Sequence, residues 1–209
     1  MAMTFWDERV VPRMVEVALR SREVGELRDR VCAGLHGRVL EIGFGSGLNV
    51  RSYPPAVTSV SAVEPSDLAW ELSERRRART DVAVVRSGLD GQRLTEDDAS
   101  HDCALVTFTL CSIPDAPTAL GEVARVLRPG GTLHVLEHGL APEESVRRWQ
   151  RRLDPVQRRV AGGCHLTRDV PALLTAAGFA TVRAEQRYLP GPTVGRPWTY
   201  GYLMVVRRP

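Results

Sequence analysis

Lysine is absent from the 209-residue sequence, so all 28 basic residues are arginine. Schiff-base catalysis, a lysine general base and a Walker-type phosphate loop each require a lysine, and the sequence therefore excludes them. An excess of one charge is also lacking, because 25 acidic residues leave a formal net charge of only +3. This balance argues against nucleic acid as the main partner.

Cysteine is scarce and scattered. The four cysteines form no C-x-x-C pair and have no histidine at a spacing typical of zinc ligands. We therefore expect four free thiols in the core and no metal site; the residues are Cys32, Cys103, Cys111 and Cys164.

Long apolar runs are missing as well. No stretch approaches the roughly 20 apolar residues that span a bilayer, and no basic start precedes an apolar segment. The sequence predicts no transmembrane segment and a cytoplasmic location. With 43% hydrophobic residues, the chain is long enough to bury the core of a single soluble domain.

Short apolar runs alternate with helical patterns between residues 38 and 137. This alternation, with short turns, predicts an α/β fold with a mostly parallel sheet. Two further runs near the C-terminus, separated by a Pro/Gly-rich link, predict an antiparallel pair at the sheet edge. The expected strands are residues 38–42, 57–63, 82–85, 103–110, 132–137, 179–188 and 200–206.

The helices are predicted from apolar spacing and from capping residues. Residues 8–35 indicate one or two amphipathic helices that break near Gly25. Aspartates are expected to cap helices at residues 67 and 115, the first helix running through Ala78. Asp154-Pro155 predicts a division of residues 146–160 into two helices, and residues 170–177 predict another.

A glycine loop follows the first predicted strand, where Glu41, Gly43, Gly45 and Gly47 form E-x-G-x-G-x-G. In an open parallel sheet, ligands bind beyond the carboxyl ends of the strands, and glycines let the backbone approach them. A dinucleotide fingerprint places its third glycine where this chain has Leu48. The loop is therefore a poor cradle for a pyrophosphate.

Two carboxylates near this loop favour a different ligand. Glu41 would repel phosphates but could hold a cationic amino group, directly or through water. Glu64 ends the second predicted strand, 17 residues after Gly47, where a carboxylate can accept both ribose hydroxyls. S-adenosylmethionine has an amino-acid end and a ribose and no phosphate. We favour this cofactor over a nicotinamide dinucleotide, which remains the alternative ligand.

At this point the sequence resembles the class I S-adenosylmethionine-dependent methyltransferases, over residues 38–137. The similarity lies in the glycine loop, VEPS at 63–66, the strand from Asp102 and LRPGG at 127–131. It implies a Rossmann-like seven-stranded sheet in the order 3-2-1-4-5-7-6, with strand 7 antiparallel and helices on both faces. It also implies cofactor-binding residues, namely Glu41, Gly43, Phe44, Gly45, Gly47, Asn49, Glu64, Pro65, Gly88, Leu89, Asp90 and Thr107.

Within that family, the resemblance narrows to the microsomal thiol methyltransferase group, whose members methylate small thiols. LCSI at 110–113, EH at 137–138 and GCHLTRD at 163–169 are among the motifs that carry it. We expect no counterpart of that group's hydrophobic N-terminal anchor, which argues against membrane association. The resemblance implies one methyltransferase domain, with a helical lid at 1–37, a cofactor-binding core at 38–140, and substrate-side helices and strands at 141–209.

Methyl transfer from a sulfonium is an in-line displacement, and a general base helps only when the acceptor must lose a proton. His138, after the fifth predicted strand, is the candidate base, with a structural role as the alternative. Cys111 is expected to pack rather than react, and the neighbouring Cys164 and His165 are not expected to face each other.

The acceptor is predicted to be a small molecule, namely a thiol, with a hydroxyl or an amine as the alternatives. A phospholipid amine is an alternative acceptor, because the segment 147–159 contains six arginines that could contact an anionic membrane. Such a run of charges is more commonly a solvated helix face. The other alternative is a cofactor-binding regulatory module without transfer activity. The sequence makes no prediction of oligomeric state.

Overall fold

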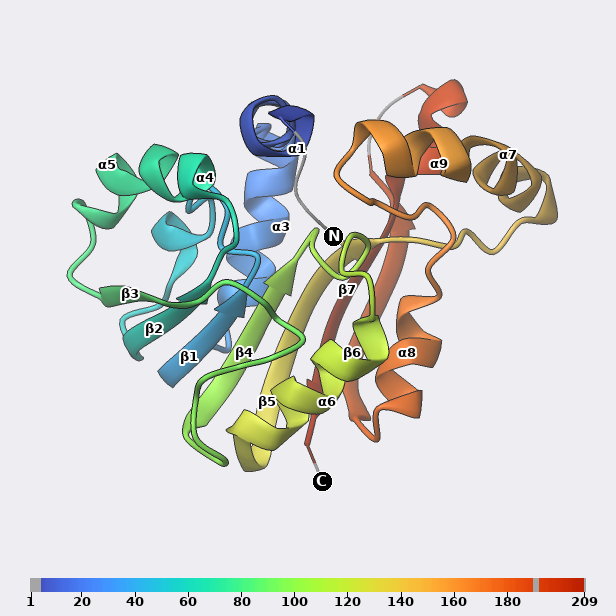
Figure 1. Cartoon of the computed structure of the whole chain (residues 1–209). Helices are drawn as coiled ribbons and strands as arrows, with labels where there is room; N and C mark the ends of the chain where they lie inside the picture. The colour runs from blue at the N-terminus through green and yellow to red at the C-terminus, as the bar shows by residue number, and fades with distance from the viewer. Residues whose placement is uncertain (1–4, 190–191, 209) are drawn as a thin grey trace.

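The computed structural model describes residues 5–189 and 192–208, and its centre is a seven-stranded sheet (Figure 1). The strand order is β3-β2-β1-β4-β5-β7-β6, with β7 antiparallel to both β5 and β6. This order confirms the prediction. The strands are β1 Gly37–Ile42, β2 Val57–Val63, β3 Ala83–Gly88, β4 His101–Thr107, β5 Leu127–His138, β6 Ala180–Tyr188 and β7 Tyr200–Arg207.

Helices cover both faces of this sheet, as Figure 1 shows for α3 behind it and α6 and α8 in front. The C-terminal ends of β4 and β5 point toward α1, α7 and α9. The helices are α1 Phe5–Arg9, α2 Val11–Ala18, α3 Arg22–Cys32, α4 Asp67–Leu72, α5 Glu74–Arg77, α6 Ala116–Val126, α7 Glu144–Val160, α8 Val170–Ala176 and α9 Arg196–Thr199. Two short 3-10 helices are Val50–Ser52 and Thr193–Gly195.

Side chains along the central strands alternate between two cores. On β1, Leu40 and Ile42 join the larger core with α6 and α8, whereas Val39 packs with Leu27 and Val31 of α3. Burial on both faces explains why the strands read as nearly continuous apolar runs. It also means that Glu41, between Leu40 and Ile42, must point into the α3 side of the molecule.

In the N-terminal region, the helices are not divided at Gly25 as predicted. Three helices form there, and the separation before α3 lies at Leu19–Ser21, where the Ser21 hydroxyl accepts a hydrogen bond from the Val24 amide. Gly25 lies inside α3. The position is occupied by glycine because a Cβ there would come within 2.0 Å of the Arg51 guanidinium. The glycine makes room for a packed side chain and does not end the helix.

The predicted helix from Asp67 to Ala78 is divided. Ser66, not Asp67, caps α4, because its hydroxyl accepts from the Ala69 amide. α4 ends at Leu72 and α5 begins at Glu74. Asp115 does cap α6 as predicted, since its carboxylate accepts from the Thr118 amide.

The predicted division at Asp154-Pro155 is wrong, because α7 runs without interruption from Glu144 to Val160. The Asp154 carboxylate is used elsewhere: it accepts from the Leu166 amide at 2.7 Å and fixes the loop that follows α7. The side chain of Gln150 anchors the same helix by donating to the carbonyls of Gly139 and Pro197.

Candidate active site

The site lies at the carboxyl ends of the strands, where the strand order reverses between β1 and β4. The glycine loop after β1 has left-handed backbone at Gly43, Gly45 and Gly47, with φ of 72°, 59° and 77°. At Gly43 a Cβ would also come within 2.0 Å of the Thr109 hydroxyl. Glycine is therefore required both for the turn and for the close approach of the β4 loop.

The three glycine amides of this loop are already engaged by the protein. Gly43 donates to the Val63 carbonyl, Gly45 to the Glu64 carboxylate and Gly47 to the Phe44 carbonyl. The loop is followed by a three-residue 3-10 helix, not by an α-helix. A pyrophosphate site uses free glycine amides at the N-terminus of an α-helix, whereas the three glycine amides here are taken and no α-helix follows the loop directly. This agrees with a ligand that carries no phosphate.

Beneath the loop, Glu41 is fully buried in a polar network. It accepts hydrogen bonds from the Asn49 amide group, at 2.9 Å, and from the Tyr53 hydroxyl. The buried guanidinium of Arg28 donates to Asn49 at 2.6 Å and to the Thr107 hydroxyl at 3.0 Å. The predicted residues Glu41, Asn49 and Thr107 are thus brought together.

The sequence reasoning missed Arg28 and Tyr53. Arg28 lies among the charges of an amphipathic helix, and no pattern distinguished it from its solvated neighbours. Burial raises the pKa of Glu41 to about 7, even though the Tyr53 and Asn49 hydrogen bonds favour its ionised form. The positive charge of nearby Arg28 also opposes this rise in the pKa of Glu41.

Glu64 lies at the end of β2 and is buried, as is the neighbouring Ser66. Its two oxygens accept from the amides of Gly45, at 2.7 Å, and Ser66, at 2.8 Å. The carboxylate thereby joins the glycine loop to the turn that contains Pro65, and each oxygen keeps a lone pair for another donor. Burial raises the pKa of Glu64, and the two amide hydrogen bonds oppose that shift.

Of the three residues predicted to lie beside the adenine, Gly88 contacts Glu64. The Glu64 amide donates to the Gly88 carbonyl at 3.0 Å, so the end of β3 lies next to the end of β2. Leu89 and Asp90 follow on the surface, where Asp90 accepts from the Gln92 amide. An exposed leucine side chain here offers an apolar surface at the edge of the site.

The N-terminal helices contact the glycine loop. Glu16 of α2 pairs with Arg76 at 2.7 Å and accepts from the Ser46 hydroxyl, while Arg76 donates to the Ser46 carbonyl at 2.9 Å. On the other side, the Trp6 indole donates to the carbonyl of Val160 at the end of α7. The helices α1 and α2 therefore extend from the loop after β1 to the loop after α7.

Glu137 and His138 end β5 and face different partners. Glu137 is fully buried, and one oxygen accepts from the amides of Thr109 and Leu110, at 2.5 and 2.7 Å. The other oxygen is buried and has no hydrogen-bond partner among the described residues. Burial raises the pKa of Glu137 to about 7, opposed first by the neighbouring His138 and then by the two amides.

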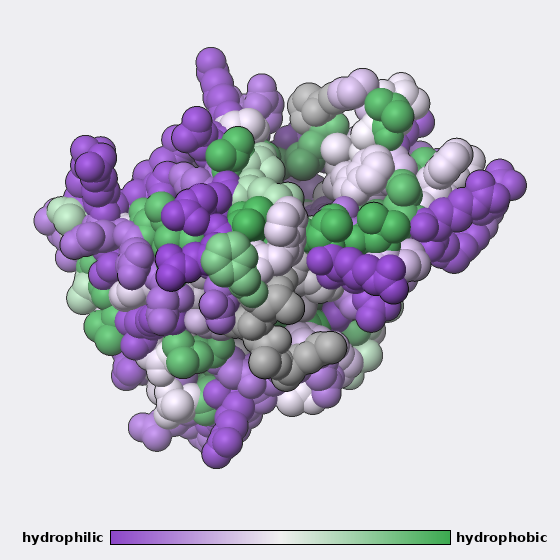
Figure 2. Space-filling view, turned by 45° about the horizontal axis from the view of Figure 1, so that its top comes forward, coloured by the Kyte–Doolittle hydropathy of each residue, from purple (hydrophilic) through white to green (hydrophobic). Residues whose placement is uncertain are grey.

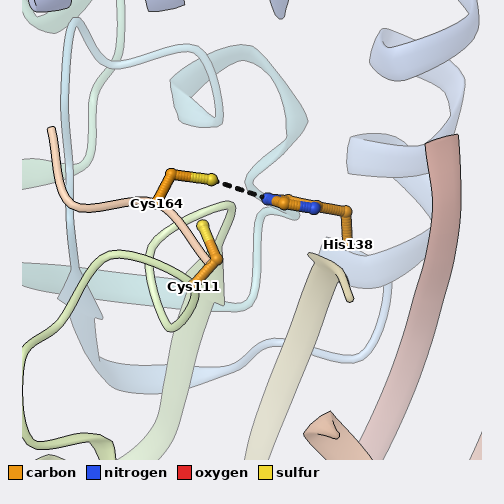
Figure 3. A group of neighbouring side chains, drawn as sticks. All are labelled: Cys111, His138 and Cys164. Carbon is orange, nitrogen blue, oxygen red and sulfur yellow. Dashed lines mark hydrogen bonds between the residues drawn. The ribbon is translucent and has the colours of Figure 1, made fainter. Parts of the chain in front are cut away.

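His138 points toward Cys111 and Cys164, as Figure 3 shows. Its Nε2 lies 3.1 Å from the Cys164 sulfur, and one ligand atom from each of the three residues lies within 4.8 Å of the other two. We call these residues the Cys–His cluster. The sequence reasoning did not predict it, and Cys164 pairs with His138 rather than with the adjacent His165.

Electrostatics within the Cys–His cluster favour an ionised sulfur. The Cys111 thiol and the His138 imidazole hold the pKa of Cys164 well below its ordinary value, although burial opposes them. The interaction with Cys164 and burial together raise the pKa of Cys111. Burial lowers the pKa of His138, but the Cys164 sulfur outweighs it, so the net shift is upward.

The loop of Cys164 packs against the loop that follows β4. Asp154 holds the Leu166 amide, and the His165 amide donates to the Cys111 carbonyl at 2.8 Å. Gly163 has φ of 82°, and a Cβ there would lie 3.3 Å from the Ser112 carbonyl oxygen. The GC motif thus lets two loops pack closely enough for their sulfurs to meet.

The surface around this edge combines apolar and charged groups. Figure 2 turns the edge toward the viewer and shows apolar residues near its centre between strongly polar flanks. α1, α2 and α7 all carry exposed apolar side chains, including Phe5, Met14, Trp149 and Val156. Within residues 5–189 and 192–208, no helix combines the length and apolar character needed to cross a bilayer.

Comparison with known proteins identifies relatives of the chain. The methyltransferase domain family matches residues 40–135. Thiol S-methyltransferase TMT1A of Homo sapiens is 34% identical over 182 residues, which cover 82% of this chain and 73% of that protein. Thiol S-methyltransferase TMT1B of Rattus norvegicus is 35% identical over 153 residues, which cover 70% of this chain and 62% of that protein. The chain thus spans roughly two thirds of these relatives.

One relative that matches over a shorter segment is named for a different substrate. Phosphatidylethanolamine N-methyltransferase of Cereibacter sphaeroides is 31% identical over 108 residues, 49% of this chain and 51% of that protein. Among solved structures, a methyltransferase from Aquifex aeolicus has a TM-score of 0.65 at 15% identity, covering 95% of this chain and 98% of its own. One from Mesorhizobium loti has a TM-score of 0.65 at 17% identity, covering 90% and 98%. At such identities the structures show a shared fold.

The buried carboxyl of Glu137 predicts a pH dependence of stability. Its folded-state pKa of about 7 exceeds the ordinary value of 4.5, so its stabilising contribution is complete below pH 4.5 and is lost as the pH rises through 7. Between pH 5 and 8, the free energy of unfolding of the wild type should fall relative to that of Glu137→Gln by about 2–3 kcal/mol. Urea denaturation of the ligand-free protein measures this difference.

The control is Glu71→Gln, which changes an exposed carboxyl on α4. The wild type and this variant should show parallel pH dependence. If Glu137→Gln also parallels the wild type, the carboxyl of Glu137 does not titrate in this range and its burial does not control stability.

Proposed function

Because the chain belongs to the class I S-adenosylmethionine-dependent methyltransferases and resembles the thiol S-methyltransferases among them, we propose that it methylates the sulfur of a small thiol. The proposal rests on one observation above all. Three segments of the resemblance, 110–113, 137–138 and 163–169, lie far apart in the sequence, yet they bring Cys111, His138 and Cys164 to one point. Sequence motifs that are far apart in the chain but meet in the folded structure indicate a functional site.

We assign the cofactor to the carboxyl ends of β1 and β2. The glycine loop forms the floor of the site, and Glu64 accepts the ribose hydroxyls with the lone pairs that Gly45 and Ser66 leave free. Gly88, Leu89 and Asp90 flank the adenine. Thr107, in the network of Arg28, Asn49 and Glu41, lies on the side of the methionine moiety.

The acceptor then lies over β4 and β5, next to His138. The reaction is an in-line displacement in which the acceptor sulfur attacks the methyl carbon and the electrons of the breaking bond pass to the leaving sulfur. His138 is our candidate for the group that takes the thiol proton. The helices α1 and α2 form a cover that excludes water, which the contacts of Glu16 and Trp6 at either end support.

An amine of a phospholipid is the second candidate acceptor. The relative from Cereibacter sphaeroides supports it, and so does α7, where Arg148, Arg151 and Arg152 are exposed. The similarity to that relative covers about half of the chain, whereas the similarity to TMT1A covers 82%. A thiol is therefore the better-supported acceptor.

An acceptor screen tests the proposed function directly. Purified protein with S-adenosylmethionine should form S-adenosylhomocysteine with small alkyl or aryl thiols, and the matched alcohols, phenols and amines should give no signal above background. Product formation only with phosphatidylethanolamine vesicles would replace the thiol by the lipid amine. Tight cofactor binding without turnover of any acceptor would instead indicate a regulatory module.

The assignment of Glu64 predicts a loss of cofactor affinity. Glu64→Ala should weaken binding of S-adenosylhomocysteine by roughly 1–3 kcal/mol, because hydrogen bonds to a buried carboxylate are lost. Glu64→Gln should lose less, since the amide keeps one acceptor oxygen. Calorimetric titration measures both variants, with Glu71→Ala as an exposed control on α4.

Thermal unfolding of each variant must accompany this titration, because Glu64 also orders the glycine loop. Unchanged affinity in a folded Glu64→Ala protein would remove Glu64 from the cofactor site.

The assignment of His138 predicts a dependence on the acidity of the thiol. His138→Asn should lower kcat by roughly 10²-fold for alkyl thiols, which are protonated at pH 7, because proton removal is then unassisted. The loss should be much smaller for an aryl thiol that is already ionised. Steady-state kinetics with both thiols measures the ratio.

His36→Asn serves as the control, because His36 is exposed and precedes β1. An equal loss for both thiols in His138→Asn would mean that His138 positions the acceptor and does not help to ionise it.

A further inference from the structure

The Cys–His cluster has the composition of a transition-metal site. It offers two sulfurs and one imidazole nitrogen, and no fourth cysteine, histidine, aspartate or glutamate joins it among the side chains that the structure describes. Thiolate and imidazole ligands select Zn²⁺ over the hard cations Mg²⁺ and Ca²⁺. We propose that Cys111, His138 and Cys164 bind a zinc ion whose fourth ligand is the thiol to be methylated.

The distances suit tetrahedral coordination. Zinc bonds of about 2.3 Å to sulfur and 2.0 Å to nitrogen place neighbouring ligand atoms about 3.5–3.8 Å apart. The cluster has 3.1 Å between the His138 Nε2 and the Cys164 sulfur, and all three ligand atoms lie within 4.8 Å of one another. Shifts of about an ångström or less, within the range of side-chain rotation, bring the three atoms to the metal.

Three protein ligands and one open position are typical of catalytic zinc sites, whereas structural sites are closed by four protein ligands. Cys111 and Cys164 come from loops, and His138 comes from the end of β5. All three residues lie at the carboxyl ends of β4 and β5, and Thr107, the last residue of β4, belongs to the proposed cofactor site. A thiol in the fourth position would therefore be presented toward the methyl donor.

Surrounding groups hold the ligands in place, as functional metal sites require. The Gln157 amide group donates to the Cys164 sulfur at 3.6 Å, and the Trp198 indole orients that glutamine through its oxygen at 3.1 Å. The His138 Nδ1 is buried and has no partner among the described residues. Because Nε2 is the ring nitrogen that faces the sulfurs, Nδ1 does not ligate the proposed metal, and a bound water is the partner that it requires.

This inference rests on the proposed thiol function and makes it more specific. Binding to zinc releases the thiol proton to solvent and leaves a thiolate on the metal. The thiolate sulfur then bonds to the methyl carbon, and the electron pair of the breaking carbon–sulfonium bond remains on the leaving sulfur. The thioether product is a weaker ligand and can leave the metal. In this scheme His138 acts as a ligand, and the metal replaces it as the group that ionises the thiol.

Cobalt substitution tests the metal site without measuring activity. Under reducing conditions, Co²⁺ added to the metal-free full-length protein should bind once per chain. It should give a sulfur-to-cobalt charge-transfer band and the visible bands of a tetrahedral site. Cys111→Ser and Cys164→Ser should each weaken Co²⁺ binding by roughly 100-fold or more, since even supporting residues contribute up to that factor.

The matched control is Cys103→Ala. Cys103 is equally buried and lies 3.4 Å from His36, but it stands outside the cluster. This variant should keep the spectrum of the wild type. A folded wild type without the band, a band that survives in both cluster variants, or a band lost in Cys103→Ala would each overturn the metal site. Circular dichroism confirms that every variant is folded.

The fourth position is tested with 2-mercaptoethanol, using ethylene glycol as the control. The thiol should change the visible cobalt bands and the diol should not; no change with the thiol would overturn its role as fourth ligand. Equal methylation rates with zinc-loaded and chelator-treated protein would overturn the metal's role while the thiol function stands. A spectral response without methylation of any thiol would instead refute the proposed function and leave the metal site in place.

Discussion

Three buried carboxylates at the carboxyl edge of the sheet hold the site together, and the rest of its geometry depends on them. Glu64 holds the glycine loop through the Gly45 amide, Glu137 holds the loop after β4 through two amides, and Glu41 holds Asn49 beneath the loop. Each carboxylate is taken out of water at a considerable cost, which the upward pKa shifts record. Because an unpaired buried carboxylate is so unfavourable, the loops that supply its donors are confined to one conformation. The backbone that meets the ligand is thereby ordered in advance of binding.

The edge is divided into two halves of different chemistry. Over β1 and β2 the groups are hard oxygen acceptors and an arginine, suited to the hydroxyls and charged ends of the proposed cofactor. Over β4 and β5 the Cys–His cluster provides soft sulfur ligands. α7 connects these halves, because the Gln150 side chain fixes it to the end of β5, Asp154 orders the loop of Cys164, and the carbonyl of Val160 meets α1. The helix that differs most from the sequence prediction is thus the one that positions the loop of Cys164, on the proposed acceptor side.

Much of the fold follows from the sequence, because fully buried parallel strands appear as apolar runs, and the resemblance supplied their order. The glycine loop and Glu64 were predictable for a similar reason: their roles depend on residues near them in the chain. The errors have physical causes. Gly25 accommodates Arg51 and does not end a helix, and Asp154 pairs with the loop at Leu166 and does not cap its own segment. No local pattern reveals Arg28 or the Cys–His cluster, since their partners are brought close only by the tertiary fold.

Charge offers a reason for placing a soft metal site next to this cofactor. The donor carries a positive sulfonium, and its charge disappears when the methyl group leaves. A zinc ion with two thiolates and a neutral histidine has no net charge, and a third thiolate from the acceptor makes the proposed complex negative. Attraction between that complex and the sulfonium, in a site covered from water, favours their close approach. Arg28 is committed to Asn49 and Thr107 beneath the cofactor half, and Arg168, beside the Cys–His cluster, donates to the Ile113 carbonyl, so neither guanidinium is held by the acceptor sulfur. In this proposal the metal places a positive charge in direct contact with the acceptor sulfur.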